Sequence, residues 1–373
     1  MILDFLTALI VFAIIITIVV TAHELGHFLG AKKTKTKVTE FAVGFPPFIW
    51  KKQIGETLFG IGAIPFGGYN KIYGESDPAK DKNDPSSYTS KSTRQKLLII
   101  IAGVIGNFIL SILLFYIVLM SSNLTTNIGL INPEYKFPVG HQENYLMINY
   151  VEDESVAKFG GLEPNNIILK INGEGVENAE DLKSIIDNTK GEALAFLVKD
   201  RKTSEESIHI INNNQDKIGI GYTNIAELSY NTNLKDKILA GVLHTYNFTS
   251  YSVSTLGDMI AKSFMNKDIS IAGNAVAGPI GIFAITKISL SEGFMYMLNI
   301  TAIISLALAI TNLMPLPALD GGKCIYLVLQ KIKPKFFTDE LSEKIDGVGF
   351  IALMILGVLI VIKDVFQFKD LIF

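Results

Sequence analysis

Cysteine and charged residues are both scarce in this chain of 373 residues. Cys324 is the only cysteine, which excludes an intramolecular disulfide and any zinc cluster built from cysteine thiolates alone. Only 18% of the residues are charged, against about 25% in an ordinary soluble domain. The net charge of −3 gives no reason to expect nucleic acid as a partner. Because 49% of the residues are hydrophobic, the composition predicts a membrane protein that contacts the lipid bilayer.

Four segments are apolar enough to cross a hydrocarbon layer about 30 Å thick, which takes about 20 helical residues. They cover residues 3–31, 97–120, 294–314 and 347–362. The last is short and would need flanking residues or a locally thinner bilayer. The first lacks a basic leader and a small-residue cleavage site, so we interpret it as a retained span and not a secretion signal. We therefore expect a polytopic α-helical membrane protein with about four transmembrane helices.

Lysine and arginine gather after the first predicted span and again after the third. Residues 32–96 hold twelve Lys or Arg against six Asp or Glu, and residues 316–346 hold five lysines. Because positive loops stay in the cytoplasm, we expect both segments inside and the N-terminus outside. The long segment 121–293 is then expected to be extracytoplasmic.

The first predicted span ends in AHELGH, which places ionisable residues in an apolar run. In a helix, positions i and i+4 share a face, so His23 and His27 can offer two imidazoles to one metal ion. Glu24 projects beside them, where its carboxylate can take a proton from an activated water. Ionisable residues inside a lipid-spanning helix are costly and rarely accidental. The pattern predicts metal-assisted hydrolysis within a membrane.

A site with two histidines needs a third protein ligand if one position is to stay open for water. The candidate is Asp320 in TNLMPLPALDGG, where two prolines end the third predicted span early and a Gly-Gly pair lets the backbone turn. We expect Asp320 at the same depth as His23 and His27. Taken alone, Asp320 could instead cap the following helix, and Asn312 could form a hydrogen bond between helices.

Residues 38–73 combine aromatic and β-branched side chains with many glycines and prolines, which predicts short β-strands. Such an apolar hairpin can enter the bilayer only where protein or a wet cavity satisfies its backbone. There it could pair with an unwound substrate segment by strand addition. A small sheet lying on the lipid headgroups is the alternative.

The extracytoplasmic segment is expected to contain two kinds of structure. Short β-like runs over 145–151, 167–171, 194–198 and 207–211 flank a helical stretch at 179–188, which predicts an inserted mixed α/β module. Residues 234–264 carry apolar side chains at helical spacing, which predicts an amphipathic helix against the outer membrane surface or the helix bundle. The expected division is 1–123 for the first membrane part, 124–225 for the module, 226–293 for the amphipathic helix and linker, and 294–373 for the second membrane part.

These motifs together resemble the site-2 protease family of intramembrane zinc metalloproteases, in the bacterial branch that includes the regulator of sigma-E protease. HELGH at 23–27 resembles that family's HExxH, and residues 312–321 resemble its N-x-x-P-x-P-x-L-D-G. PFGGY at 65–69 is similar to its G-G-Y hairpin, and GPIG at 278–281 to its G-P-x-G. The extracytoplasmic module is similar to a single PDZ domain through AKFGGL at 157–162 and ING at 171–173.

The resemblance implies a role for nine residues. His23, His27 and Asp320 would bind zinc, and Glu24 would be the general base. Asn312 would orient the scissile carbonyl, Gly67, Gly68 and Tyr69 would hold the substrate extended, and Asn107 would face the site from the second span. Two departures stand out, because Val104 replaces a proline on the second span and Asn165-Asn166 replaces the usual Gly-Asp of the PDZ-like domain.

The function implied is regulated intramembrane proteolysis in a bacterial inner (plasma) membrane. The substrates would be single-span membrane proteins, such as anti-sigma factor-like proteins, or remnant signal peptides. A catalytically inactive, membrane-anchored PDZ adaptor is the alternative, but it leaves Glu24, His27 and Asp320 unexplained in apolar surroundings. A zinc transporter would need further polar residues across the bilayer, and the second and fourth predicted spans offer almost none.

Overall fold

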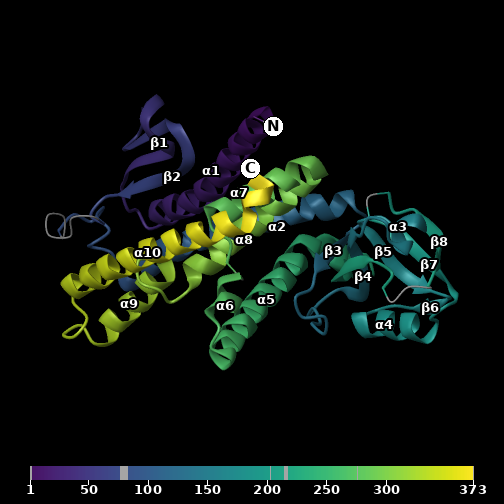
Figure 1. Cartoon of the computed structure of the whole chain (residues 1–373). Helices are drawn as coiled ribbons and strands as arrows, with labels where there is room; N and C mark the ends of the chain where they lie inside the picture. The colour runs from purple at the N-terminus through teal and green to yellow at the C-terminus, as the bar shows by residue number, and fades with distance from the viewer. Residues whose placement is uncertain (1, 76–82, 202, 214–216, 275, 373) are drawn as a thin grey trace. The chain divides into compact units, whose positions relative to one another are not determined.

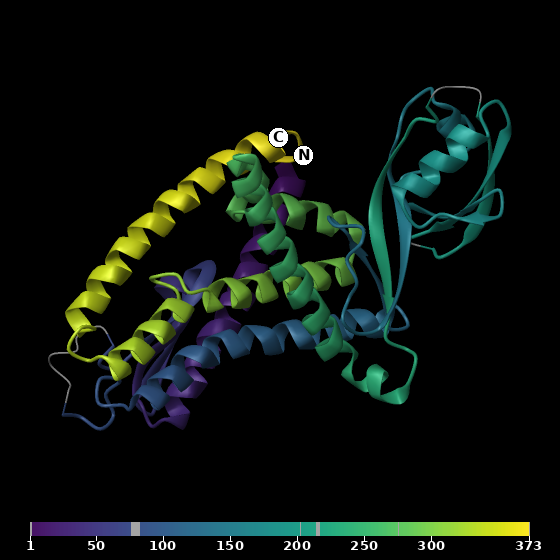
Figure 2. The same cartoon turned by 90° about the horizontal axis from the view of Figure 1, so that it is seen from below.

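Residue contacts divide the chain into two structural units, which Figure 1 and Figure 2 show from two sides. We call Met1–Val118 with Leu256–Phe373 the helical unit, and Leu119–Thr255 the β unit. The computed structural model describes residues 2–75, 83–201, 203–213, 217–274 and 276–372.

Four helices of the chain are long and apolar enough to cross a membrane, which confirms a polytopic membrane protein. They are α1 (Ile2–Lys33), α2 (Thr93–Ser121), α8 (Phe294–Leu313) and α10 (Asp339–Ile372). The prediction of a short fourth span is wrong. Its apolar residues form the middle of a helix of 34 residues, of which Asp339–Lys369 is the candidate span, so no thinning of the bilayer is needed.

The predicted β region forms two long, bent strands, β1 (Val38–Ile54) and β2 (Thr57–Ile72), which lie beside α1 (Figure 1). Phe41 of β1 is paired with both Phe59 and Asn70 of β2, so the first half of β1 lies between the two halves of β2. The predicted short strands are therefore continuous, because the glycines bend the backbone without ending the pairing. At Gly62 a Cβ atom would lie 2.2 Å from the Phe45 carbonyl oxygen, so this approach requires glycine.

Glycines also bring α1 and α2 together. A Cβ atom on Gly26 would lie 2.0 Å from the carbonyl oxygen of Ala102, and one on Gly106 would lie 2.3 Å from that of Ala22. Small residues at a membrane helix interface allow the two backbones to approach closely. This crossing holds the part of α1 that carries HELGH against α2.

The segment expected as a linker contains two further helices, α6 (Ile269–Asn274) and α7 (Pro279–Glu292). Helix α7 packs against α1, α8 and α10, and it was missed because its 14 residues are too few for a span. Its first turn is capped from α10. The Oδ2 atom of the buried Asp364 accepts hydrogen bonds from the N–H groups of Gly278 at 2.9 Å and Gly281 at 2.7 Å.

The β unit contains a sheet of seven strands in the order β3-β9-β4-β5-β7-β8, with β6 paired to β5. The strands are β3 (Thr125–Gly129), β4 (His141–Val151), β5 (Asn166–Ile171), β6 (Glu174–Gly175), β7 (Ala193–Asp200), β8 (Glu206–Asn212) and β9 (Ile220–Ser229). Four of them match the predicted β-like runs, and α4 (Ala179–Asn188) matches the predicted helix, whereas α3 (Val156–Phe159) was not predicted. The expected boundary at residue 225 falls inside β9, which stays paired with β3 and β4 up to Ser229.

The predicted amphipathic helix is α5 (Leu234–Asn266), and the face that packs in the β unit carries several buried polar side chains. His244 and Asn247 are buried and hydrogen-bond to the Tyr230 hydroxyl, and the Tyr251 hydroxyl donates to the Gly129 carbonyl. The apolar side chains on its other face are exposed, including Leu234, Ile238, Val242 and Tyr246, and their contact with the outer membrane surface or the helix bundle stays a prediction. Hydrogen bonds and the burial of Ala240 and the Tyr251 ring together hold this part of α5.

Replacing Asp364 with alanine should destabilise the helical unit, because it leaves the N–H groups of Gly278 and Gly281 buried without their acceptor. Each such group costs about 1–3 kcal/mol, so we expect the free energy of unfolding to fall by about 2–5 kcal/mol in a denaturant titration in detergent. Glu340→Ala, in the exposed first turn of α10, is the control and should change it by less than about 0.5 kcal/mol. Equal stability of the two variants would contradict the capping role.

Candidate metal centre

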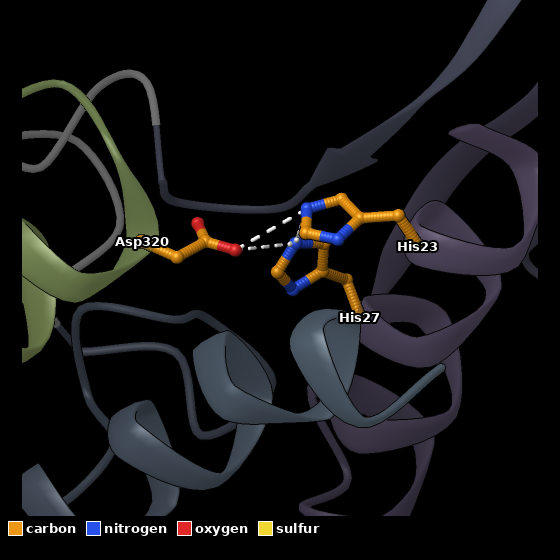
Figure 3. Close-up of side chains that lie close together, drawn as sticks. All are labelled: His23, His27 and Asp320. Atoms are coloured by element: carbon orange, nitrogen blue, oxygen red, sulfur yellow. Dashed lines mark hydrogen bonds and ion pairs between the residues drawn. The ribbon is translucent and has the colours of Figure 1, made fainter. Parts of the chain in front are cut away.

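Two histidines of α1 and one aspartate of α9 (Asp320–Ile332) converge in the helical unit (Figure 3). Helix α9 lies between the end of α8 and the start of α10 (Figure 2). The Nε2 atoms of His23 and His27 are 3.0 Å apart. The Oδ2 atom of Asp320 lies 3.2 Å from His23 Nε2 and 3.3 Å from His27 Nε2. The three side chains are only 11–13% exposed, so the donor atoms meet in a largely water-excluded place.

The spacing of these three atoms suits a zinc ion. In a tetrahedral site with bonds of about 2.0–2.1 Å to nitrogen and oxygen, ligand atoms lie about 3.3–3.4 Å apart. Asp320 Oδ2 is buried, and no hydrogen bond reaches it within the part of the chain that the structure describes. A buried carboxylate oxygen without a hydrogen-bond donor is costly unless a cation is beside it. Two imidazole nitrogens and one carboxylate oxygen also form a donor set that catalytic zinc sites use.

Helix α2 fixes the orientation of the His27 ring. The Nδ1 atom of His27 lies 2.9 Å from the Ile99 carbonyl oxygen. A carbonyl only accepts, so Nδ1 carries the proton and Nε2 keeps the lone pair that a metal needs. A Cβ atom on Gly103 would lie 2.4 Å from His27 Nε2, so glycine is required beside the ring.

The loop before α9 places Asp320 by close backbone contacts. Leu319 is the N-cap residue and no side chain caps this helix, so the interpretation of Asp320 as a helix cap is wrong. The following glycines do not form the predicted turn but lie within α9. A Cβ atom on Gly321 would lie 2.4 Å from the carbonyl oxygens of Leu313 and Met314, and one on Gly322 would lie 2.1 Å from a loop carbonyl. The loop can fold back on the helix because both side chains are missing.

Glu24 is held by a residue that the sequence did not single out. The side-chain Nδ2 atom of Asn70, in β2, donates to the Glu24 carboxylate oxygen Oε2 at 2.9 Å. It also donates to the Glu24 backbone carbonyl at 2.5 Å. Glu24 is half-buried and follows His23 directly in α1, so the two hydrogen bonds restrain a carboxylate that comes from the same turn as one of the donor atoms.

The hairpin residues expected to bind substrate lie next to α1. The Gly67 N–H donates to Thr17 Oγ1 at 3.4 Å, and Gly68 is buried. The Tyr69 hydroxyl donates to Glu40 Oε1 at 2.5 Å. Burial and the neighbouring Glu40 carboxylate raise the pKa of Tyr69 to about 12, so the phenol is neutral at physiological pH.

Asn107 and Asn312 were also predicted for the site, and no contact of either with the three donor atoms is described. Asn107 is fully buried in α2, and its backbone carbonyl accepts hydrogen bonds from the hydroxyls of Ser111 and Ser305. The polar atoms of its side chain have no partner among the residues with a described placement. Asn312 is half-buried in the last turn of α8, and no hydrogen bond of its side chain is described.

Two residues that shape the site were missed, although each leaves a signal in the sequence. Asn70 is a polar residue inside an apolar strand, directly after the GGY motif. Gly103 belongs to a pair with Gly106 on the second span, and Gly26 and Gly30 form a similar pair on the first. Paired small residues in apolar helices indicate close helix packing.

Two imidazoles and a carboxylate that can bind a metal ion lie near a further carboxylate within a bundle of apolar helices. This arrangement is typical of a membrane-bound metallohydrolase. The chain belongs to peptidase family M50, whose model matches residues 11–356. It is 30% identical to a protein of Clostridium acetobutylicum that carries the provisional name zinc metalloprotease, over 96% of both chains. It is 24% identical to the zinc metalloprotease RasP of Geobacillus kaustophilus, over 97% of this chain and 99% of that one.

These similarities confirm the resemblance to site-2 proteases. The chain is a zinc metalloprotease, and its apolar helices and family make it a bacterial membrane protein.

Replacing Gly103 with alanine should weaken zinc binding, because the new methyl group would displace the His27 ring. We expect the affinity for zinc to fall by about 10- to 100-fold, the range found when groups that orient metal ligands are changed. Competition with a chromophoric chelator on the purified protein measures this affinity. Gly357→Ala is the control, because a Cβ atom there meets nothing within 4 Å. Equal zinc affinity of both variants would rule out this role of Gly103.

Proposed function

We propose that the protein hydrolyses peptide bonds within the membrane segments of single-span membrane proteins or remnant signal peptides. In this proposal His23 Nε2, His27 Nε2 and Asp320 Oδ2 hold the zinc ion. The observation that carries it is the 3.0–3.3 Å spacing of these three atoms, two of which belong to a candidate membrane span. A metal centre inside a span can act only on a chain that enters the membrane.

Zinc, when bound, supplies Lewis acidity that activates a water molecule and polarises a carbonyl group. The Glu24 carboxylate accepts the proton of the attacking water and returns it to the amine nitrogen that leaves. Asn312 orients the scissile carbonyl and stabilises its developing negative charge. The low exposure of His23, His27 and Asp320 strengthens these electrostatic interactions.

The hairpin supplies a place for the substrate backbone. A helical substrate hides its carbonyls in its own hydrogen bonds, so it must unwind before it can be cut. The last part of β2, Gly68–Ile72, pairs with β1 on one side only among the strands that the structure describes. Its other edge can pair with an extended substrate segment next to Glu24, which Asn70 of the same strand contacts.

The remaining parts follow from the same proposal. The N-terminus and the β unit lie outside the cell, and the basic segment 32–96 lies in the cytoplasm. Residues 124–225, extended by the end of β9, form a PDZ-like domain that screens substrates by size or by their ends. Cleavage releases a cytoplasmic fragment, as in regulated intramembrane proteolysis, from substrates such as anti-sigma factor-like proteins in the bacterial plasma membrane.

Replacing Glu24 with glutamine should preserve zinc binding and abolish cleavage, because the amide cannot accept the proton. We expect the cleavage rate of a single-span substrate in detergent to fall by about 100- to 10,000-fold, with zinc content unchanged. Asp320→Ala is the matched comparison and should lose zinc as well. Cleavage by Glu24→Gln at the wild-type rate would show that another group is the base. A wild-type protein that binds peptides through the β unit but cuts no membrane substrate would instead be the adaptor.

A further inference from the structure

We propose that Asn70 is the positioning residue of the catalytic centre, holding the Glu24 carboxylate in the orientation that accepts the proton. This inference rests on the proposed function. It concerns a side chain of the hairpin that lies next to the metal centre but binds neither the metal ion nor, in this proposal, the substrate.

The contact has two points. The Asn70 amide nitrogen reaches the Glu24 backbone carbonyl at 2.5 Å and the carboxylate oxygen Oε2 at 2.9 Å. The first bond anchors the amide to α1, and the second restrains the flexible glutamate side chain relative to that anchor. The hydrogen bond to a carboxylate is charge-assisted and stronger than one between neutral groups.

The hydrogen bond from Asn70 to Glu24 Oε2 leaves the other carboxylate oxygen of Glu24 available for proton transfer. Among the residues whose placement is described, none donates a hydrogen bond to Glu24 Oε1. Asn70 therefore occupies Oε2 and leaves Oε1 to meet the attacking water. A general base must lie within hydrogen-bond reach of the proton that it takes, so fixing this oxygen sets the efficiency of the step.

The strand register delivers Asn70 to this place. Asn70 is paired with Phe41 in the hairpin, and neighbouring side chains in a strand point to opposite faces. Tyr69 reaches Glu40 within the hairpin, whereas Asn70 reaches across to α1. The strand segment proposed to pair with the substrate therefore also holds the Glu24 carboxylate. The substrate backbone and the general base are thus positioned by the same strand.

One atom of the Asn70 side chain is unfavourable for stability. Its Oδ1 atom is buried and has no hydrogen-bond partner in the described part of the chain, which is unfavourable for folding. Asparagine is also disfavoured in strands, where valine of nearly the same size is favoured. A buried asparagine whose oxygen has no described partner, and whose donor atom contacts the general base, points to a role in catalysis.

The test compares Asn70→Val with the wild-type protein, using a fluorogenic peptide that contains a membrane segment. Because only the placement of the base is lost, we expect kcat to fall by about 10- to 100-fold, KM to stay within about twofold and zinc content to stay unchanged. Gln53→Leu is the matched control. It removes a hydrogen bond within the hairpin to the Gly55 carbonyl, outside the segment Gly68–Ile72, and should keep the wild-type kcat.

A double-mutant comparison separates positioning from a general structural effect. In Glu24→Asp the shorter side chain cannot keep the Asn70 contact, so adding Asn70→Val should lower its residual kcat by less than about twofold. An equally large loss when Asn70→Val is added to the wild-type protein and to Glu24→Asp would overturn the proposal, because Asn70 would then act independently of Glu24.

The remaining outcomes are also decisive. A wild-type protein that cuts nothing would refute the proposed function itself, whereas a normal kcat for Asn70→Val in an active enzyme would refute only the role of Asn70.

Should Asn70→Val fail to fold, as shown by lost zinc and aggregation, Asn70→Asp replaces it. Aspartate keeps the shape but presents a negative oxygen to Glu24, so a wild-type kcat in that variant would also overturn the proposal.

Discussion

The close contact between α1 and α2 is the constraint on which the candidate metal centre depends. Four glycines at this interface, Gly26, Gly30, Gly103 and Gly106, leave no room for any larger side chain. The same contact lets the Ile99 carbonyl bind His27 Nδ1 and lets the ring fit against Gly103. Backbone packing in the apolar bundle therefore determines which imidazole nitrogen faces the other histidine and Asp320.

Three parts of the chain that are far apart in sequence meet where α1 packs against α2. Each part contributes a different polar group. Helix α1 provides the imidazoles, the loop before α9 brings a carboxylate to them, and β2 contributes an amide that restrains Glu24. Every one of these polar groups lies in or beside apolar structure, where an unpaired polar group is expensive. The buried Asp320 Oδ2 and Asn70 Oδ1 atoms lack described hydrogen-bond partners, which agrees with a site built to bind other groups.

The sequence predicted the features that depend on local spacing. The i, i+4 histidines, three of the four spans and the helix at 179–188 follow from periodicity and composition. The convergence of Asp320 on the histidines was expected from the family resemblance and from matching depths. Asn70, Gly103 and the cap by Asp364 were not predicted, because each depends on the register between elements far apart in the chain. The hydrogen bonds that join α5 to the rest of the β unit were not predicted either, because they reach the carbonyls of Gly129 and Val139, far away in the chain.

The most direct test of the central claim is X-ray absorption at the zinc edge of the purified wild-type protein. Binding by His23, His27 and Asp320 predicts two imidazoles and oxygen donors at about 2.0–2.1 Å, with no sulfur. A zinc–sulfur distance of about 2.3 Å, which only Cys324 or a methionine could supply, would contradict it. A spectrum that contains a single imidazole would contradict it equally.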